Sequence, residues 1–380
     1  MTIRETEPAA ACPDFHVAPR GLDGVAGVAI IVYAWSKAVE RAIRDTEAST
    51  VVFDPRWRNS GSDFDRLAEF GGQILSVGIQ TSDVEDLSPI ARLTHLERFQ
   101  AHCAIETLDF GKLVKLRECL LAGVTALGNL AAAPSLEDVA LVKGTIRNLE
   151  SLRAATGIRR LLLNDLPRLS TLDGLPCHAL ENLRLHYLPR LKSVAGVCDA
   201  GNLAALEIVG CSGIADAEII GGVEWLRMLR LHGPSIDSFD FIARIAELRD
   251  LSFSTGAVRA DPILIAPIAT LRKLTRLGLA DLKRVADIGR IADIRSLEWL
   301  SIVRGPTLPS LAFLKTLTSL RELSISKTRV QDGDFHVLLE LPALERVHAL
   351  QPHRKHYSQT KDEVNAVLDS RRSKAQSMGA

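Results

Sequence analysis

Apolar residues recur along most of this chain at a regular interval of about 22 residues, and this period restricts the fold more than any other feature. Ile74 and Leu344 open the first and the last of thirteen units, and twelve of these units are complete. Nearly every unit begins L-x-x-L-x-L or a close variant of it, as in LENLRL, LRMLRL and LRELSI. A repeat of this length predicts stacked units that bury their apolar faces against one another. The other openings are Leu96, Leu116, Leu136, Ile158, Leu180, Leu203, Leu226, Leu248, Leu274, Leu297 and Leu320.

Each unit has two halves with different periodicities. The L-x-L centre has period 2, which predicts a short strand whose alternate side chains face the core. The second half has an apolar residue at every third position, as from Val84 to Leu93. Period 3 indicates a tight return with 3₁₀ or short helical turns. Strands of successive units are therefore expected to pair in parallel along one face, with the returns covering the other.

These patterns resemble the leucine-rich-repeat superfamily over about 275 of the 380 residues. The units opening at Ile74, Leu226 and Leu320 are most similar to the 22-residue class of internalins and related bacterial proteins. The resemblance implies an α/β fold, a right-handed horseshoe-shaped solenoid with one short parallel strand per repeat. The fold itself does not specify a function. The resemblance therefore implies only the general expectation of a scaffold that binds another macromolecule.

The ninth position of each unit departs from the family pattern. The family usually places Asn there, whose amide bonds to the backbone of adjacent turns, and none of the twelve units has Asn. Only Ser82, Thr328 and, weakly, Cys211 are expected to supply a side-chain hydrogen bond, so the other turns need different partners. Three units carry Leu at this position and are more similar to repeats of intracellular sensor-type proteins: Leu166, Leu188 and Leu282.

The leucine-poor ends predict caps around the repeat region of residues 74–350. Residues 1–23 are expected to be flexible, 24–73 to form an N-terminal α/β cap, and 351–380 a C-terminal helical cap or tail. The cap is predicted to contain strands at 29–33 and 51–53 and helices at 36–45 and 65–70, with a turn-rich loop, PRWRNSGSD, before the second helix. The apolar run of residues 24–35 is too short to span a bilayer. It is interpreted as a buried strand, with an interfacial anchor as the alternative.

A last helix is predicted over residues 361–371, with an apolar side formed by Val364, Val367 and Leu368. It is interpreted as a cap for the final repeat. The alternative is a partner-docking tail that carries five basic residues: Arg354, Lys355, Arg371, Arg372 and Lys374.

Composition narrows the class of protein further. Lys and Arg number 46, as do Asp and Glu, so the basic surplus of a dedicated nucleic-acid binder is absent. The first residues lack the pattern of a secretory signal. Six cysteines form no CxxC pair, which favours reduced thiols, although Cys177 and Cys198 lie one repeat apart and their pairing is left open. We therefore predict a cytoplasmic, monomeric protein without a membrane segment.

The sequence contains no motif that indicates catalysis, a cofactor or a metal site. It has no G-x-S-x-G, P-loop or G-x-G-x-x-G pattern. His102, His186 and His232 share one repeat position but belong to units two, six and eight. Parallel strands about 4.8 Å apart would hold them too far from one another for one metal ion. We therefore predict that the protein is not an enzyme.

The third, fifth and seventh residues of each unit lie on its strand and are expected to face outward. Aligned over successive units, they form three columns, which we call columns three, five and seven. An apolar patch is predicted from Leu120, Ala122, Ala140, Val142 and Leu162, and a basic band from Arg160, Arg184, His186, Arg230 and His232, interrupted by Glu207. Exposed apolar surface beside arginine favours a protein-contact site. Trp299, in column three, is a separate candidate for anchoring a partner. The alternative is that its side chain folds over its neighbours.

Two other interpretations of these columns stay open. Small outward residues also suit close strand packing without any function. A nucleic-acid or glycan receptor that uses the basic band is the alternative function, although neutral charge and few aromatic residues argue against it, since unpaired bases and sugars need stacking platforms.

Overall fold

The computed structural model describes residues 14–18, 27–58, 61–234, 236–254, 261–350 and 357–378. The chain divides into two compact units, unit 1 (Met1–Ile146 and Ser151–Ile158) and unit 2 (Arg147–Glu150 and Arg159–Ala380). Several predicted features lie outside the described residues: Cys12, most of the flexible segment 1–23, and Arg354 and Lys355 of the basic tail.

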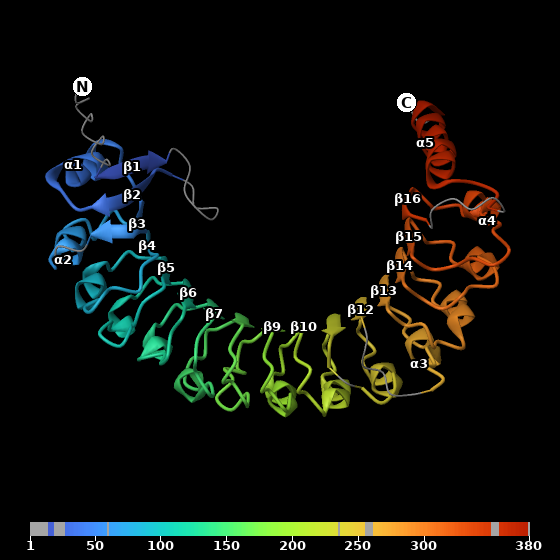
Figure 1. Cartoon of the computed structure of the whole chain (residues 1–380), viewed down its shortest axis with the longest axis horizontal. Helices are drawn as coiled ribbons and strands as arrows, with labels where there is room; N and C mark the ends of the chain where they lie inside the picture. The colour runs from blue at the N-terminus through green and yellow to red at the C-terminus, as the bar shows by residue number, and fades with distance from the viewer. Residues whose placement is uncertain are drawn as a thin grey trace, which may run out of the picture. The chain divides into compact units, whose positions relative to one another are not determined.

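Unit 1 contains strands that follow one another in chain order (Figure 1). β1 (Phe15–Ala18) pairs with β2 in antiparallel fashion, and the later strands pair in parallel. They are β2 (Ala29–Ala34), β3 (Thr50–Arg58), β4 (Ser76–Ile79), β5 (Arg98–Ala101), β6 (Glu118–Ala122) and β7 (Asp138–Val142). The helical elements are α1 (Lys37–Asp45), α2 (Asp63–Ala68), η2 (Ser88–Arg92), η3 (Phe110–Lys112) and η4 (Leu130–Ala132).

Unit 2 repeats the same alternation of a parallel strand and a short return (Figure 1). Its strands are β8 (Arg160–Asn164), β9 (Asn182–His186), β10 (Ala205–Val209), β11 (Met228–His232), β12 (Asp250–Ser254), β13 (Arg276–Ala280), β14 (Trp299–Val303), β15 (Glu322–Ser326) and β16 (Arg346–Ala349). Its helical elements are η5 (Glu150–Leu152), η6 (Ala195–Asp199), η7 (Ala217–Gly222), η8 (Asp240–Arg244), α3 (Ala266–Ala269), η9 (Ile288–Asp293), η10 (Ala312–Thr316), α4 (His336–Glu340) and α5 (Lys361–Met378).

The core is built from the repeated apolar positions that the sequence predicts. In β9, for example, Leu183 and Leu185 are fully buried, and Arg184 between them is exposed. Burying each such leucine stabilises the fold by about 1.5–3 kcal/mol relative to an exposed side chain. The parallel strands and 3₁₀ returns confirm the predicted leucine-rich-repeat solenoid.

In several repeats, the residue that follows the strand supplies a backbone hydrogen bond in place of the missing asparagine ladder. Tyr187 and Arg304 have left-handed φ values of 52° and 51°. This conformation directs each N–H to the carbonyl group that ends the next strand, at 2.8 Å from Tyr187 to Val209 and 2.9 Å from Arg304 to Ser326. A left-handed residue costs roughly 1–2 kcal/mol when it is not glycine. The hydrogen bond offsets that cost by satisfying an otherwise buried backbone donor.

Position nine behaves as predicted in two of three units. Buried Thr328 accepts a hydrogen bond from the Gly305 N–H at 2.9 Å and donates to the Ser326 carbonyl at 3.1 Å. The Cys211 thiol donates to the Leu185 carbonyl at 3.3 Å. The prediction for Ser82 was wrong, because its side chain is exposed and forms no hydrogen bond with any described residue.

The N-terminal region contains more strand than the sequence predicts. β1 lies within the segment expected to be flexible, and β3 continues to Arg58 through residues expected to form a loop. The reason is Trp57, which is buried with its ring centroid 4.7 Å from that of Phe53. Ser36 directly precedes α1, but its hydroxyl group makes no capping hydrogen bond.

At the other end, α5 packs beside β16. Val364 and Leu368 are buried, whereas Val367 is exposed, so two of the three predicted apolar residues face the protein. The Asn365 side chain pairs with both backbone groups of Val347, each at 2.9 Å, as a neighbouring strand would. The register of β16 also slips by one residue against β15, which places Ala349 opposite Ser324. His348 therefore leaves column five and contacts Glu322 at 2.7 Å.

Candidate protein-interaction surface

The outward columns of unit 2 form because its strands pair in register. Glu207 of β10 lies opposite Arg184 of β9 and Arg230 of β11, all at column five. Column three places Asp250 of β12 opposite Arg276 of β13. Side chains two residues apart on one strand share a face, so columns three, five and seven form one surface.

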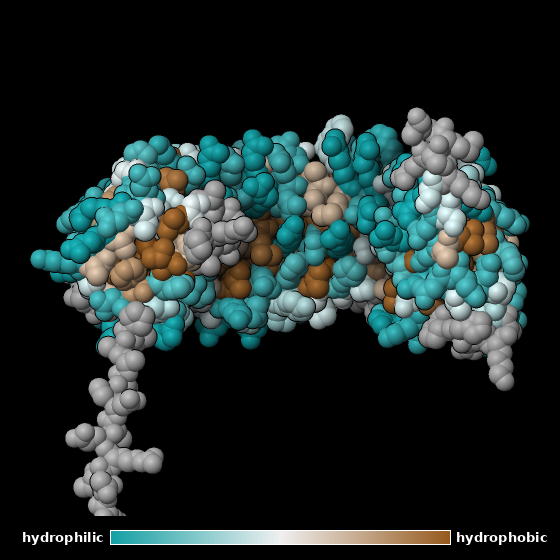
Figure 2. Space-filling model, turned by 90° about the horizontal axis from the view of Figure 1, so that it is seen from above, coloured by the Kyte–Doolittle hydropathy of each residue, from teal (hydrophilic) through white to brown (hydrophobic). Residues whose placement is uncertain are grey.

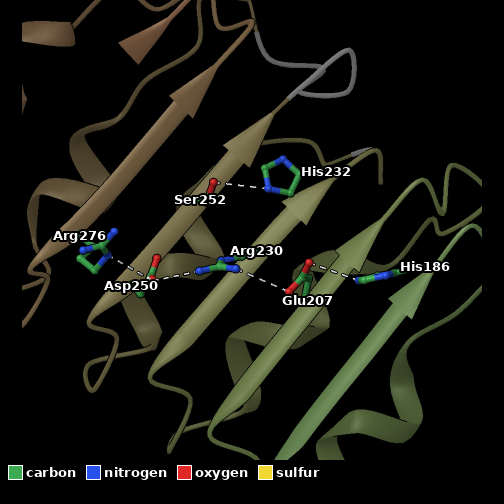
Figure 3. A network of polar contacts seen from close by, with 7 residues as sticks. All are labelled: His186, Glu207, Arg230, His232, Asp250, Ser252 and Arg276. Atoms are coloured by element: carbon green, nitrogen blue, oxygen red, sulfur yellow. Dashed lines mark hydrogen bonds and ion pairs between the residues drawn. The ribbon is translucent and has the colours of Figure 1, made fainter. Parts of the chain in front are cut away.

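A chain of alternating basic and acidic side chains crosses this surface and ends at a tryptophan, and we name these residues the charged cluster: His186, Glu207, Arg230, Asp250, Arg276 and Trp299. Glu207 lies 3.3 Å from His186 Nε2 and 3.7 Å from Arg230 Nη1 (Figure 3). Asp250 Oδ2 lies 3.4 Å from Arg230 Nη2 and 3.6 Å from Arg276 Nε. The predicted basic band is therefore not uniformly basic, because Glu207 and Asp250 both pair with Arg230 at its centre.

The carboxylates lie deeper than the arginines. The side chains of Glu207 and Asp250 are 17% and 22% exposed, whereas those of Arg230 and Arg276 are 40% and 49% exposed. Pairs this open to water contribute at most about 1 kcal/mol each to stability. Their main effect is to hold the guanidinium groups in defined positions, which lowers the entropy lost when a partner binds.

Two histidines line the same surface with different hydrogen bonding. Burial, opposed by Glu207 and reinforced by Arg230, lowers the pKa of His232 below its ordinary 6.5. Its ring lies 3.4 Å from the Ser252 hydroxyl group (Figure 3). His186 Nε2 is buried and, although it lies near Glu207, forms no hydrogen bond with any described residue.

Trp299 folds over its neighbours, as one of its two predicted interpretations stated. The Arg276 guanidinium group lies 4.7 Å from the centroid of the indole ring. A Cβ atom at Gly278 would lie 3.5 Å from the Trp299 ring, which covers this glycine. Trp299 is thus half-buried and joined to the charged cluster through Arg276, rather than being an isolated anchor.

Unit 1 carries the predicted apolar patch in part. Leu120 and Ala122 of β6 lie opposite Ala140 and Val142 of β7, and all four are half-buried. Leu162, predicted as the fifth member, belongs to β8 of unit 2, where it is also half-buried. Figure 2 shows small groups of hydrophobic residues interspersed with hydrophilic ones on the face it presents.

The other predicted residues lie on the predicted face. Arg160 and Arg184 are exposed on β8 and β9 and do not belong to the charged cluster. Sequence reasoning missed Asp250 and Arg276 because only columns five and seven were read in full. Column three contains both and would have shown the alternation of charge.

The described residues show no arrangement suited to metal or thiol chemistry. No group of three His, Cys, Asp or Glu residues among them is placed to hold a metal ion. Five cysteines in the described part of the chain are free thiols, and burial raises the pKa of Cys103 and of Cys211 to about 11. A thiol with such a pKa is a poor nucleophile. No described helix has the length and apolar character needed to cross a membrane.

No protein-family model and no curated protein matches the sequence. Solved structures do match: an internalin from Listeria monocytogenes is 19% identical with a TM-score of 0.56, over 76% of this chain and 85% of that one. A leucine-rich-repeat protein from Leptospira interrogans is 14% identical with a TM-score of 0.56, over 83% and 93%. TLR13, in a complex with single-stranded RNA, is 18% identical with a TM-score of 0.57, over 78% and 49%.

This chain spans about half of the TLR13 chain. Identities this low establish the fold alone, and they agree with the repeat length and the strand register. The chain has the leucine-rich-repeat fold of the Listeria internalin and of the Leptospira protein.

Proposed function

We propose that this protein is a binding scaffold without chemistry of its own, and that the charged cluster of unit 2 contacts a protein partner. The observation that carries the proposal is the pairing of both arginines of the cluster with carboxylates beside an aromatic ring. Arginine and tryptophan are enriched among the residues that dominate protein interfaces. Fixed cations and anions side by side suit a partner that presents both signs of charge.

A protein partner fits this surface better than a nucleic acid does. Glu207 and Asp250 lie at the centre of the cluster and would repel phosphate groups. Apolar contacts with the partner would come from Trp299 and from half-buried Leu162, which lies in column five of β8, next to β9. The single-stranded RNA of the TLR13 complex keeps the nucleic-acid alternative as an outcome to be tested. The cytoplasmic location, the monomeric state and the absence of catalysis stay predictions.

Quantitative affinity purification with Arg276→Glu tests the proposal. Arg276 pairs with Asp250 inside the cluster, and Arg321 pairs with Glu345 at 2.9 Å outside it. Arg321→Glu is therefore a matched control that reverses one acid-paired arginine of the same unit. Loss of an interface hot spot costs about 2 kcal/mol or more, which is roughly a 30-fold loss of affinity. We expect Arg276→Glu to lose the partner and Arg321→Glu to retain it.

Two results would contradict the proposal. Equal recovery of the same proteins by both variants would remove the charged cluster from the interface. Binding of single-stranded RNA whose affinity falls steeply with salt concentration, and which Arg276→Glu abolishes, would assign the surface to nucleic acid instead.

A further inference from the structure

A second feature of unit 2 lies in the turns that follow its strands, apart from the charged cluster. A pocket of about 430 Å³ is lined by Arg147, Arg168, Ser170 and Arg190. We name it the arginine pocket. It shares no residue with the charged cluster. Its volume falls within the range of small-molecule sites, about 300–1,000 Å³.

The local sequence holds two of these arginines in equivalent positions. Arg168 and Arg190 each stand in the motif L-P-R-L, one repeat apart, on the turns after β8 and β9. The leucines on both sides of each Pro-Arg pair are fully buried, so the arginines between them project outward on successive turns. The four anchoring leucines are Leu166, Leu169, Leu188 and Leu191.

Arg147 reaches the pocket from the preceding turn. The Ser170 N–H donates to the Arg147 carbonyl group at 3.3 Å, which brings the two backbones together. Three successive turns of the solenoid therefore each supply one guanidinium group, and the middle turn also supplies the Ser170 hydroxyl group. Because the packed core fixes these turns, the pocket exists before any ligand binds.

The charge of the arginine pocket is uncompensated. Arg147, Arg168 and Arg190 form no ion pair or side-chain hydrogen bond with any residue that the structure describes. Elsewhere in unit 2, Arg159 pairs with Glu181 at 2.8 Å, and Arg304 pairs with Asp281. Three like charges around one small volume repel one another, and a bound anion would relieve that repulsion.

The lining also indicates what kind of anion fits. It contains no aromatic ring on which a base could stack and no large apolar side chain that could bury part of a peptide. What remains is a set of planar guanidinium donors, which match the oxygen atoms of phosphate in bidentate geometry. The three positive charges of these groups exceed the roughly two negative charges that a single phosphate group carries at neutral pH.

We propose that the arginine pocket binds a small polyphosphate, a compact ligand with at least two linked phosphoryl groups. Arg168 and Arg190 chelate its phosphoryl oxygens from one side, and Arg147 neutralises it from the preceding turn. The Ser170 hydroxyl group donates a further hydrogen bond. The ligand undergoes no covalent step, and its role is to hold the three arginine side chains in one arrangement on the preformed turns.

Isothermal titration calorimetry of the full chain with inorganic tripolyphosphate, at low ionic strength, tests the proposal. We expect saturable binding that Arg168→Ala/Arg190→Ala weakens by at least about tenfold, because each charge-assisted hydrogen bond to phosphate is strong. Arg272→Ala/Arg295→Ala is the matched control: it also removes two exposed, unpaired arginines from consecutive repeats of unit 2. This control should bind within about twofold of the wild-type affinity, because both arginines lie outside the pocket.

Other ligands and variants complete the test. We expect pyrophosphate to bind and orthophosphate to bind more weakly. We expect Arg168→Lys/Arg190→Lys to bind tripolyphosphate less tightly than the wild type, because lysine keeps the positive charge but lacks the paired donors of a guanidinium group. Absence of tripolyphosphate binding, or equal weakening in the control variant, would overturn the proposal. Tighter binding of a phosphoserine peptide than of tripolyphosphate would also overturn it. Arg276→Glu should bind tripolyphosphate normally, which separates this result from the proposed partner interface.

Discussion

The strand faces of the two units carry different surfaces on the same framework. In unit 1, β6 and β7 present half-buried apolar residues such as Leu120 and Val142. In unit 2, β9 to β14 present the charged cluster. The inward positions of the strands are apolar and buried in both units, so the difference in polarity lies in residues that the core does not restrict. Stability and recognition are therefore carried by separate columns of the same strands.

The comparison would fail if the inward strand positions contributed differently to stability in the two units. Leu141 of β7 and Leu185 of β9 occupy the same inward position and are both fully buried. We expect Leu141→Ala and Leu185→Ala each to lower the free energy of unfolding by about 2–5 kcal/mol through lost burial and a cavity. Denaturant unfolding followed by circular dichroism measures this. A cost below about 1 kcal/mol for either variant would contradict the assignment of that column to the core.

Position nine offers a sharper test of how the core satisfies its polar groups. Thr328→Val keeps the shape but removes the oxygen that accepts from the Gly305 N–H. A buried donor left unpaired costs about 1–3 kcal/mol, so we expect a loss of that size in unfolding free energy. Exposed Thr307 provides the control, since Thr307→Val should change stability by less than about 0.5 kcal/mol. Equal effects of the two substitutions would mean that the Thr328 bond is dispensable.

Half-buried His232, beside the charged cluster, makes stability depend on pH. Because burial lowers the pKa of His232, the folded protein takes up this proton less readily than the unfolded chain does. This contribution to stability is complete above pH 6.5 and is lost as the pH falls through 6.5 towards the folded-state pKa. We expect His232→Gln to reduce the decline in unfolding free energy between about pH 8 and pH 5. An NMR titration of the His232 ring with a midpoint at or above 6.5 would contradict this.

Substitutions of outward-facing residues are expected to have the smallest effect on stability, although they alter partner binding. Leu162 and Arg184 lie on outward positions of β8 and β9. Leu162→Asp/Arg184→Glu should leave the circular dichroism spectrum intact and change unfolding free energy by no more than about 0.5 kcal/mol per site. The same variant should lose the protein partner. Unfolding of the double variant would show that these side chains support the core, and retention of the partner would remove them from the interface.

Much of the fold could be predicted because burial imposes a periodic pattern on the sequence. The strands at Asn182–His186 and Met228–His232 follow directly from L-x-L spacing. The extension of β3 through Trp57 could not be predicted, because one buried ring overrides the local preference of Pro55 for a turn. The register slip at His348 depends in the same way on how β16 meets β15.

For the surface, the sequence by itself determined which residues point outward, since alternation along a strand decides that from spacing alone. Only the tertiary structure decided which of them meet. Asp250 lies one repeat after Arg230 and one repeat before Arg276, and parallel stacking brings all three into contact. The arginine pocket likewise unites three turns that no local pattern connects. The physical reason is that a solenoid sets neighbours by stacking of whole repeats, so contacts between repeats depend on register rather than on sequence distance.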